Sequence, residues 1–364
     1  MAFVRHSSSL KLLLLFSAFL SLSPRNSLLE AAPQVPCYFV FGDSLSDNGN
    51  NNNLIALAKA NYLPYGIDFP EGPTGRFTNG PNIIDYIAQL LGFDRYIQNF
   101  TAALANQDFT RGVNYASGAA GIRDETGIQQ GDRISLNNQL LRHSSIVAKI
   151  RAIQGTQAAD SLLNKCIYTV GMGNNDYINN YFMPAFYSTS RLYTPQQYAV
   201  VLANQYSNQL KDLHDLGARK VAILGPGLIG CAPQEVSTFG ATNGSTCNEQ
   251  LNSEVALFNN QLRPLVQSLN NQFPDSNFTL IDIFSISSST SLAQLNLTAP
   301  CCETNPTTGT CKPNGAVCPD RKAYGFFDGY HPTSILCQGL ASRSYMRVLP
   351  TDADPYDIRQ LAMQ

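Results

Sequence analysis

Five short apolar runs divide the chain from residue 37 onward. They lie at 37–41, 112–116, 166–170, 220–224 and 278–283, and each ends near Gly, Ser or Asn. Runs that are short and continuously apolar, rather than alternating with polar residues, are typical of strands buried on both faces. The pattern therefore predicts five central strands.

Longer segments with helical spacing of apolar residues lie between these runs. In the clearest one, Tyr198, Leu202 and Leu213 fall on one face. The expected helices are one from Thr194-Pro195 to the stop at Gly217, one from the capping box Thr246-x-x-Glu249 through Leu269 with a kink at Pro264, one from the cap Asn79 through Pro81 to Gly92, a short one near Leu54 and one starting at Pro332.

Strands and helices thus alternate along the chain, which favours an α/β fold. Continuous apolar strands linked by helices imply a parallel sheet that is covered on both faces. In such sheets, binding sites form at the carboxyl ends of the strands. No repeat, heptad run or linker divides the chain, so we expect one domain over 33–364.

The N-terminal segment has the composition of a secretory signal peptide. Arg5 and Lys11 precede an apolar stretch at 12–22, and small and polar residues follow before Pro33. The alternative, a membrane anchor, needs about 20 apolar residues, roughly twice what is present. We therefore expect residues 1–32 to be a signal peptide, cleaved between about Ser23 and Pro33, and no transmembrane anchor. The expected location is extracellular, the apoplast or cell wall if the source is a plant.

Composition narrows the range of partners. Only 14% of the 364 residues are charged, with 24 Lys and Arg against 26 Asp and Glu, and 32 asparagines supply much of the polarity. Such a balance offers few cations to neutralise phosphates, which argues against a nucleic-acid partner. Four Asn-x-Ser/Thr sites are candidate glycan acceptors in a secreted chain: Asn99, Asn243, Asn277 and Asn296.

The nine cysteines all follow the signal segment, where disulfides persist. An odd number leaves at least one unpaired. Four of them, Cys301, Cys302, Cys311 and Cys318, lie in one Pro/Gly/Thr/Asn-rich loop. Because this cluster lacks Cys-x-x-Cys pairs, we interpret it as a set of disulfides rather than a zinc site, with the pairing left open.

Among the three histidines beyond the signal segment, His331 is the candidate general base. His143 and His214 fall within helical patterns, where surface or packing roles are expected. His331 follows Asp328 by three residues, so this carboxylate is placed to fix the imidazole tautomer. The alternative at this position is a structural capping turn.

Ser44 is the candidate nucleophile, at the end of the first predicted strand. A lone Gly-Asp-Ser is usually a turn, and the Gly-x-Ser-x-Gly elbow is absent because position 46 is Ser46. Acyl transfer also requires donors for an oxyanion. The Gly- and Asn-containing strand ends at 116–121 and 173–176 are able to supply them, although each alone is more often a turn.

Together these segments resemble the plant GDSL esterase/lipase family of the SGNH hydrolases, over essentially the whole mature chain. The matching blocks, in the family's order, are FGDSLSDNGN at 41–50, GRFTNG at 75–80, NYASG at 114–118, GNND at 173–176 and DGYHP at 328–332. The resemblance implies a three-layer α/β/α sandwich of the flavodoxin-like SGNH type. It also implies that Ser44 is the nucleophile, His331 the base and Asp328 its orienting carboxylate.

The same resemblance places the oxyanion hole at the backbone of Ser44 and Gly118 and the side chain of Asn175, with Asn174 as the fallback. A serine mechanism needs no metal or organic cofactor. The leading hypothesis is a secreted serine esterase acting on acyl-lipid or cell-wall-type esters. An acyltransferase using the same residues and a non-catalytic binding protein on the same scaffold are the alternatives. The sequence leaves the ester, the acyl length and the oligomeric state open.

Overall fold

A five-stranded sheet in the order β1-β2-β3-β4-β7 forms the centre of the computed structural model, which describes residues 1–2, 32–288 and 294–364. The strands are β1 Tyr38–Gly42, β2 Ile167–Gly171, β3 Lys220–Leu224, β4 Asn277–Ile281 and β7 Ala353–Asp354. The first four are parallel, as predicted, while the edge strand β7 runs antiparallel to β4. In register, Gly42, Gly171, Leu224 and Ile281 share one end of the sheet.

One predicted strand is absent as a regular element. The segment at 112–116 lies alongside β1 and exchanges backbone hydrogen bonds with it, through Val40 and its neighbours, but forms only isolated bridges. Gly112 explains the close approach, because a Cβ at this position would lie 1.9 Å from the carbonyl oxygen of Tyr38. The expected strand is therefore an irregular extended segment.

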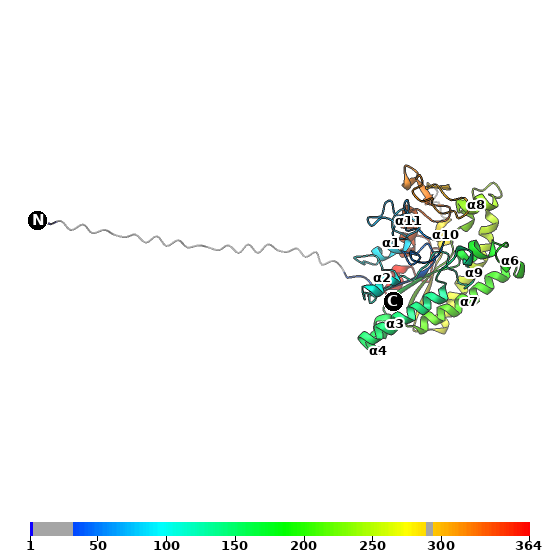
Figure 1. Cartoon of the computed structure of the whole chain (residues 1–364). Helices are drawn as coiled ribbons and strands as arrows, with labels where there is room; N and C mark the ends of the chain where they lie inside the picture. Colours follow the sequence, from blue (N-terminus) through cyan, green and yellow to red (C-terminus); the bar gives the residue numbers. More distant parts are fainter. Residues whose placement is uncertain (3–31, 289–293) are drawn as a thin grey trace. The chain divides into compact units, whose positions relative to one another are not determined.

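Helices cover both faces of the sheet, so the predicted three-layer α/β/α fold is confirmed (Figure 1). Alternate residues of β1 point to opposite faces: Phe39 and Phe41 pack with one helix layer, and Tyr38 and Val40 with the other. The first layer contains α3 Leu136–Gln154, α7 Pro195–Asp215 and α9 Glu249–Gln272. The second contains α1 Ile83–Leu90, α10 Ile283–Ser287, α11 Ser334–Tyr345 and α12 Ile358–Ala362.

Shorter elements complete the described part of the chain. They are α2 Phe100–Ala105, α4 Thr156–Leu163, α5 Asn174–Asp176, α6 Thr189–Leu192, α8 Pro233–Phe239, the 3₁₀ turns η1 Ile128–Gln130, η3 Ile229–Cys231 and η5 Arg321–Ala323, the short π-helix η2 Tyr177–Tyr181, and the strand pair β5 Asn296–Pro300 and β6 Tyr324–Phe326. Residues 33–364 form one compact unit. The predicted signal peptide lies almost wholly outside the described residues and stays a prediction.

The helix boundaries test the capping predictions. Thr194 caps α7, at the helix start that the sequence predicts, and the Gln197 side chain accepts the Thr194 N–H in return. The cap of α1 is Asn82 rather than Asn79, whose side chain instead accepts the Ser334 N–H at 2.9 Å. Similarly, Asn248 rather than Thr246 caps α9. In both cases the cap is the residue immediately before the helix and not the predicted residue further upstream. Only the side chain of the nearer residue reaches the free N–H groups of the first turn.

The helix predicted near Leu54 does not form, and turns occupy that part of the chain. The side chains of Asn50 and Asn51 are hydrogen-bonded to the backbone around residues 114–118 instead. Asparagine side chains that bind backbone groups compete with helix formation. Pro264 lies inside α9, which continues on both sides of it, and the kink expected there stays a prediction.

Eight cysteines pair in four disulfides: Cys37–Cys166, Cys231–Cys247, Cys301–Cys318 and Cys302–Cys311. The loop cluster is thus paired within itself. Cys337 is the free cysteine among the described residues, and it is buried.

The four candidate glycan acceptors differ in exposure. Asn243 and Asn296 are exposed, while Asn99 and Asn277 are half-buried. Asn99 caps α2, and Asn277 is the first residue of β4 rather than a loop residue. Exposure therefore favours Asn243 and Asn296 as acceptors.

Candidate active site

Ser44 lies in the turn that ends β1, at the carboxyl end of the sheet. The turn is held by its own backbone, with the N–H groups of Ser46 and Asp47 donating to the carbonyl of Asp43 at 3.1 and 3.0 Å. The Asp43 carboxylate accepts the Leu45 N–H at 3.0 Å. Burial raises the pKa of Asp43, and hydrogen bonds from Asn174 and Leu45 oppose that rise. The motif Asp thus shapes the turn that presents the serine.

His331 joins Ser44 to Asp328 in a continuous hydrogen-bonded series. Its Nε2 lies 2.7 Å from the Ser44 Oγ, and its Nδ1 lies 2.9 and 2.8 Å from the two carboxylate oxygens of Asp328. Asp328 is fully buried, and Ser44 and His331 are only 9% and 8% exposed. With Nδ1–H donated to the carboxylate, Nε2 is the nitrogen left to accept the serine proton.

The Asp328 carboxylate accepts three further hydrogen bonds. The N–H groups of Tyr330 and His331 donate to its Oδ1 at 2.8 and 2.7 Å, and the Tyr65 hydroxyl donates to its Oδ2. The Tyr65 oxygen also accepts the Cys311 N–H at 3.1 Å, which connects the carboxylate to the disulfide loop. No sequence signal indicates Tyr65, because it precedes Asp328 by 263 residues. Phe77, from the GRFTNG block, packs its ring 4.8 Å from the His331 ring.

The asparagine-rich segment after Ser44 is hydrogen-bonded to the extended segment at 114–116. Asn50 donates from Nδ2 to the carbonyls of Asn114 and Ala116, at 3.0 and 2.8 Å. In return, Asn114 donates to the Ser46 carbonyl at 2.7 Å. These buried amides satisfy backbone groups that no regular strand pairs. The sequence pattern gives no sign of this structural role of Asn50 and Asn114.

The predicted oxyanion-hole residues all lie near Ser44, but their donors differ in availability. The Gly118 N–H already donates to the Asp47 carboxylate at 3.0 Å. Asn175 lines the cavity, donates from Nδ2 to the Ala120 carbonyl at 3.0 Å and keeps a second N–H. The Nδ2 of Asn174, the fallback residue, donates to Asp43 at 2.9 Å.

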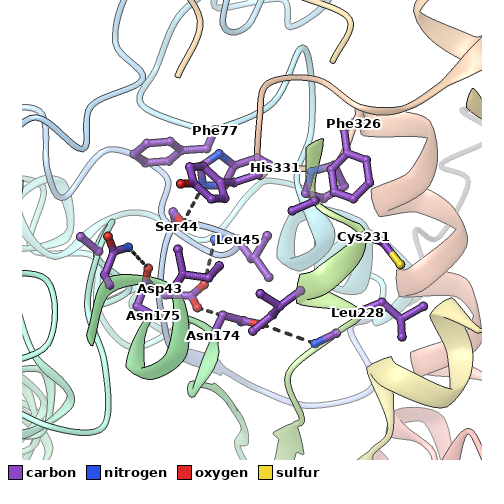
Figure 2. Close-up of a pocket in the computed structure, with 18 of the residues that line it drawn as sticks. Asp43, Ser44, Leu45, Phe77, Asn174, Asn175, Leu228, Cys231, Phe326 and His331 are labelled. Carbon is purple, nitrogen blue, oxygen red and sulfur yellow. Dashed lines mark hydrogen bonds between the residues drawn. The ribbon is translucent and has the colours of Figure 1, made fainter. Parts of the chain in front are cut away.

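A cavity of about 180 Å³ opens beside Ser44 and His331 (Figure 2). Its wall is largely apolar, and its polar residues include those of the serine turn and α5 as well as Gln130, Ser287, Thr308 and Thr310. The lining residues include Asp43, Ser44, Leu45, Phe77, Ala119, Gln130, Asn174, Asn175, Asn179, Ile283, Leu297, Phe326, Tyr330, His331, Leu336 and Leu340. A largely apolar lining with a few polar groups is typical of small-molecule binding sites.

The other two histidines lie outside this cavity. His143 is fully buried among Phe39, Phe41 and Tyr115, and burial lowers its pKa to about 3. His214 lies at the end of α7, stacked on Phe273 with its ring centroid 3.9 Å away. Both have the packing roles that the sequence predicts.

The chain is similar to a known protein family and to individual curated proteins. The family model described as GDSL-like Lipase/Acylhydrolase matches residues 38–335. GDSL esterase/lipase At1g29660 of Arabidopsis thaliana is 47% identical over 92% of this chain and 93% of its own length. GDSL esterase/lipase At1g29670 of the same plant is 48% identical over 92% of this chain and 93% of its own length.

A solved lipase, Lip_vut3 from a goat rumen metagenome, is similar to 84% of this chain and 94% of its own, with a TM-score of 0.38 and 10% identity. That score is too low to bear on the fold. The family match and the identity to curated relatives over nearly the whole chain are sufficient by themselves. The chain therefore belongs to the GDSL-like lipase/acylhydrolase family, a family of ester hydrolases.

Proposed function

We propose that the protein is a secreted serine esterase that hydrolyses carboxylic esters of the acyl-lipid or cell-wall type through an acyl-enzyme on Ser44. The observation that carries this proposal is the series from Ser44 Oγ through His331 to Asp328, at 2.7 and 2.8 Å, beside an apolar cavity. Nucleophile and base within hydrogen-bond reach, with the base oriented by a third group, are the signature of an activated serine.

In the first half of the reaction, Ser44 Oγ attacks the ester carbonyl carbon and its proton passes to His331 Nε2. The carbonyl oxygen gains the negative charge, which the Ser44 N–H, a second N–H assigned by the family resemblance to Gly118, and the Asn175 amide stabilise. The tetrahedral intermediate then collapses, the bond to the alcohol oxygen breaks, and His331 returns the proton to that oxygen.

In the second half, water replaces the alcohol. His331 takes a proton from the water as its oxygen attacks the acyl carbon, and the serine leaves with that proton. Asp328 keeps the imidazole in one tautomer throughout and stabilises its charged form. The net change is one ester and one water converted to a carboxylic acid and an alcohol.

Secretion is part of the proposal because two features favour it. The N-terminal residues have a signal-peptide composition, and the four disulfides require an oxidising compartment to persist. In the described residues, no helix combines the length and the hydropathy needed to cross a bilayer.

The decisive experiment is labelling of the folded protein with a fluorophosphonate, followed by peptide mapping. We expect the label on Ser44, no label in Ser44→Ala, and strongly reduced labelling in His331→Ala, together with loss of ester hydrolysis in both variants. A protein that folds but takes no label and hydrolyses no ester would overturn the proposal in favour of a binding role. Product analysis with added alcohols separates hydrolysis from acyl transfer to an alcohol.

A further inference from the structure

The cavity beside Ser44 has two chemically different sides. On one side lie Asn175 and two amides close to it: Asn179, whose Nδ2 donates to the Asn175 Oδ1 at 2.6 Å, and Gln130. Much of the remaining lining, including Leu45 and Phe326 (Figure 2), is apolar, although it also contains Ser287, Thr308 and Thr310. The apolar wall includes Leu45, Ile283, Leu297, Phe326, Leu336 and Leu340.

Helix α11 gives the apolar side its direction. The helix begins three residues after His331, with Thr333 as its N-cap. Leu336 and Leu340 are four residues apart, so they lie on one face of the helix, one turn and about 6 Å from each other. Both line the cavity and both pack in the same apolar cluster as Ile283. Leu336 is therefore close to the catalytic histidine, and Leu340 is one turn further away.

We propose that this apolar side binds the acyl chain of the ester, and that Leu336 and Leu340 set the accepted chain length. The inference rests on the proposed esterase function and names its substrate class: esters of medium to long unbranched acids. A methylene group of the acyl chain contributes favourable free energy only if the apolar wall buries it. Each buried methylene should therefore raise kcat/KM by about fourfold. The alcohol part of the substrate lies on the side of Gln130 and Asn179, whose amides are able to bind hydroxyl groups.

The test compares p-nitrophenyl esters from acetate to palmitate across a set of variants. Leu336→Phe fills the near part of the cavity and should lower kcat/KM for long esters by about tenfold or more while sparing acetate. Leu340→Phe should spare medium chains as well, and Leu340→Ala should move the optimum toward longer chains. Gln130→Ala should leave the chain-length profile unchanged and alter the preference among esters that differ in their alcohol.

Leu361→Ala is the matched control, because Leu361 is a fully buried leucine on α12 that does not line the cavity. Any effect of general destabilisation should appear there too, without a change in chain-length profile. An active wild type with the same profile in all Leu336 and Leu340 variants would overturn this inference alone. A wild type that hydrolyses none of the esters and takes no label at Ser44 would overturn the proposed function as well.

A second inference concerns the oxyanion hole. Because the Gly118 N–H is bound to Asp47, the donor that the family resemblance assigns is already in use. The next residue, Ala119, lines the cavity, and its N–H has no acceptor among the residues that the structure describes. Ala119 also has a φ of +65°, a left-handed conformation that costs a non-glycine residue free energy and that occurs preferentially at functional sites.

The geometry points to the backbone N–H of Ala119, rather than that of Gly118, as the donor that joins the Ser44 N–H and the Asn175 amide. A crystal structure of the phosphonate adduct on Ser44 tests this directly, because the phosphonyl oxygen occupies the oxyanion position. We expect that oxygen at about 2.7–3.1 Å from the Ala119 nitrogen, with the Gly118 N–H still donating to Asp47. An adduct whose oxygen is bound by Gly118, with Ala119 N–H turned elsewhere, would overturn the assignment.

Discussion

Asp328 illustrates how the direction of a single buried carboxylate is fixed by its hydrogen-bond donors. It accepts bonds from the imidazole, two backbone N–H groups and the Tyr65 hydroxyl. A carboxylate with this many donors is positioned by its surroundings rather than by its own rotamer preference. The orientation of His331 toward Ser44 thus depends on residues from distant parts of the chain.

We therefore expect Asp328→Asn to lower kcat by about 10⁴-fold while the protein remains folded, because the amide favours the wrong imidazole tautomer. Steady-state kinetics with a soluble ester and a far-UV circular dichroism spectrum are the measurements. Tyr65→Phe, which removes one donor and keeps the tautomer, should have a much smaller effect. Equal losses in the two variants would contradict the tautomer explanation.

Glu235 is a buried acid outside the catalytic series. Only 3% of it is exposed, its Oε2 has no hydrogen-bond partner among the described residues, and burial raises its pKa from 4.5 to about 8. Between these two values the unfolded chain loses the proton and the folded protein keeps it. The unfolded state then binds fewer protons, so stability falls as pH rises through this window.

Glu235→Gln should remove that loss, because the amide is uncharged in both states. The free energy of unfolding of the variant, minus that of the wild type, should increase with pH between about 5 and 8, by at most about 1.4 kcal/mol for each pH unit. Urea unfolding at several pH values measures it. Glu303→Gln is the control, because Lys312 lowers the pKa of Glu303, so this carboxyl is ionised in both states and its difference should not vary with pH in this window. A difference that does not vary with pH would contradict the argument.

At the scale of elements, the sequence predicts the capping residue of a helix reliably where the helix starts in solvent. The helix predicted to start at Thr194-Pro195 does start there, and Thr194 forms a capping box with Gln197 in an exposed loop. At α1 the predicted cap is not used. This helix starts beside α11, and the Asn79 side chain accepts the Ser334 N–H instead. Tertiary contacts therefore decide which of two plausible caps is used.

The cap of α7 allows a clean stability test. Thr194→Ala should lower the free energy of unfolding by about 1 kcal/mol, because the Gln197 N–H loses its acceptor. Thr194→Ser keeps the hydroxyl and should restore most of that loss. Urea midpoints of the three proteins are the measurement, and a serine variant as unstable as the alanine variant would show that the hydroxyl is not the cause.

At the scale of the whole molecule, the disulfides have two separate roles. Cys37–Cys166 joins the starts of β1 and β2 across a sequence separation of 129, whereas Cys302–Cys311 closes a separation of 9 beside the active site. The long closure restricts the unfolded chain more. The short one holds Cys311, whose N–H donates to the Tyr65 oxygen that in turn binds Asp328.

Replacing both cysteines of a pair by serine should separate these roles. Loss of Cys37–Cys166 should cost about 5 kcal/mol of stability and loss of Cys302–Cys311 about 3 kcal/mol, by loop entropy. The second variant should lose the larger share of kcat, because the support of Tyr65 is weakened. Urea unfolding and ester hydrolysis measured on the same preparations test both statements, and the reverse ranking of kcat would contradict the second.

The sequence alone determines the main elements of this protein and predicts the residues of its proposed chemistry. Strand runs such as 220–224 are predicted within a residue or two, since burial on both faces requires uninterrupted apolar residues. Ser44, Asp328 and His331 are identifiable because few residue types activate a hydroxyl and the chain has few histidines.

Only the tertiary structure decides how distant residues satisfy one another. The cysteine pairing, the role of Tyr65, the binding of Gly118 to Asp47 and the buried amides of Asn50 and Asn114 all depend on segments far apart in the chain. The physical reason is that buried polar groups must find partners in space. Local propensity and spacing carry no information about which partner lies within reach.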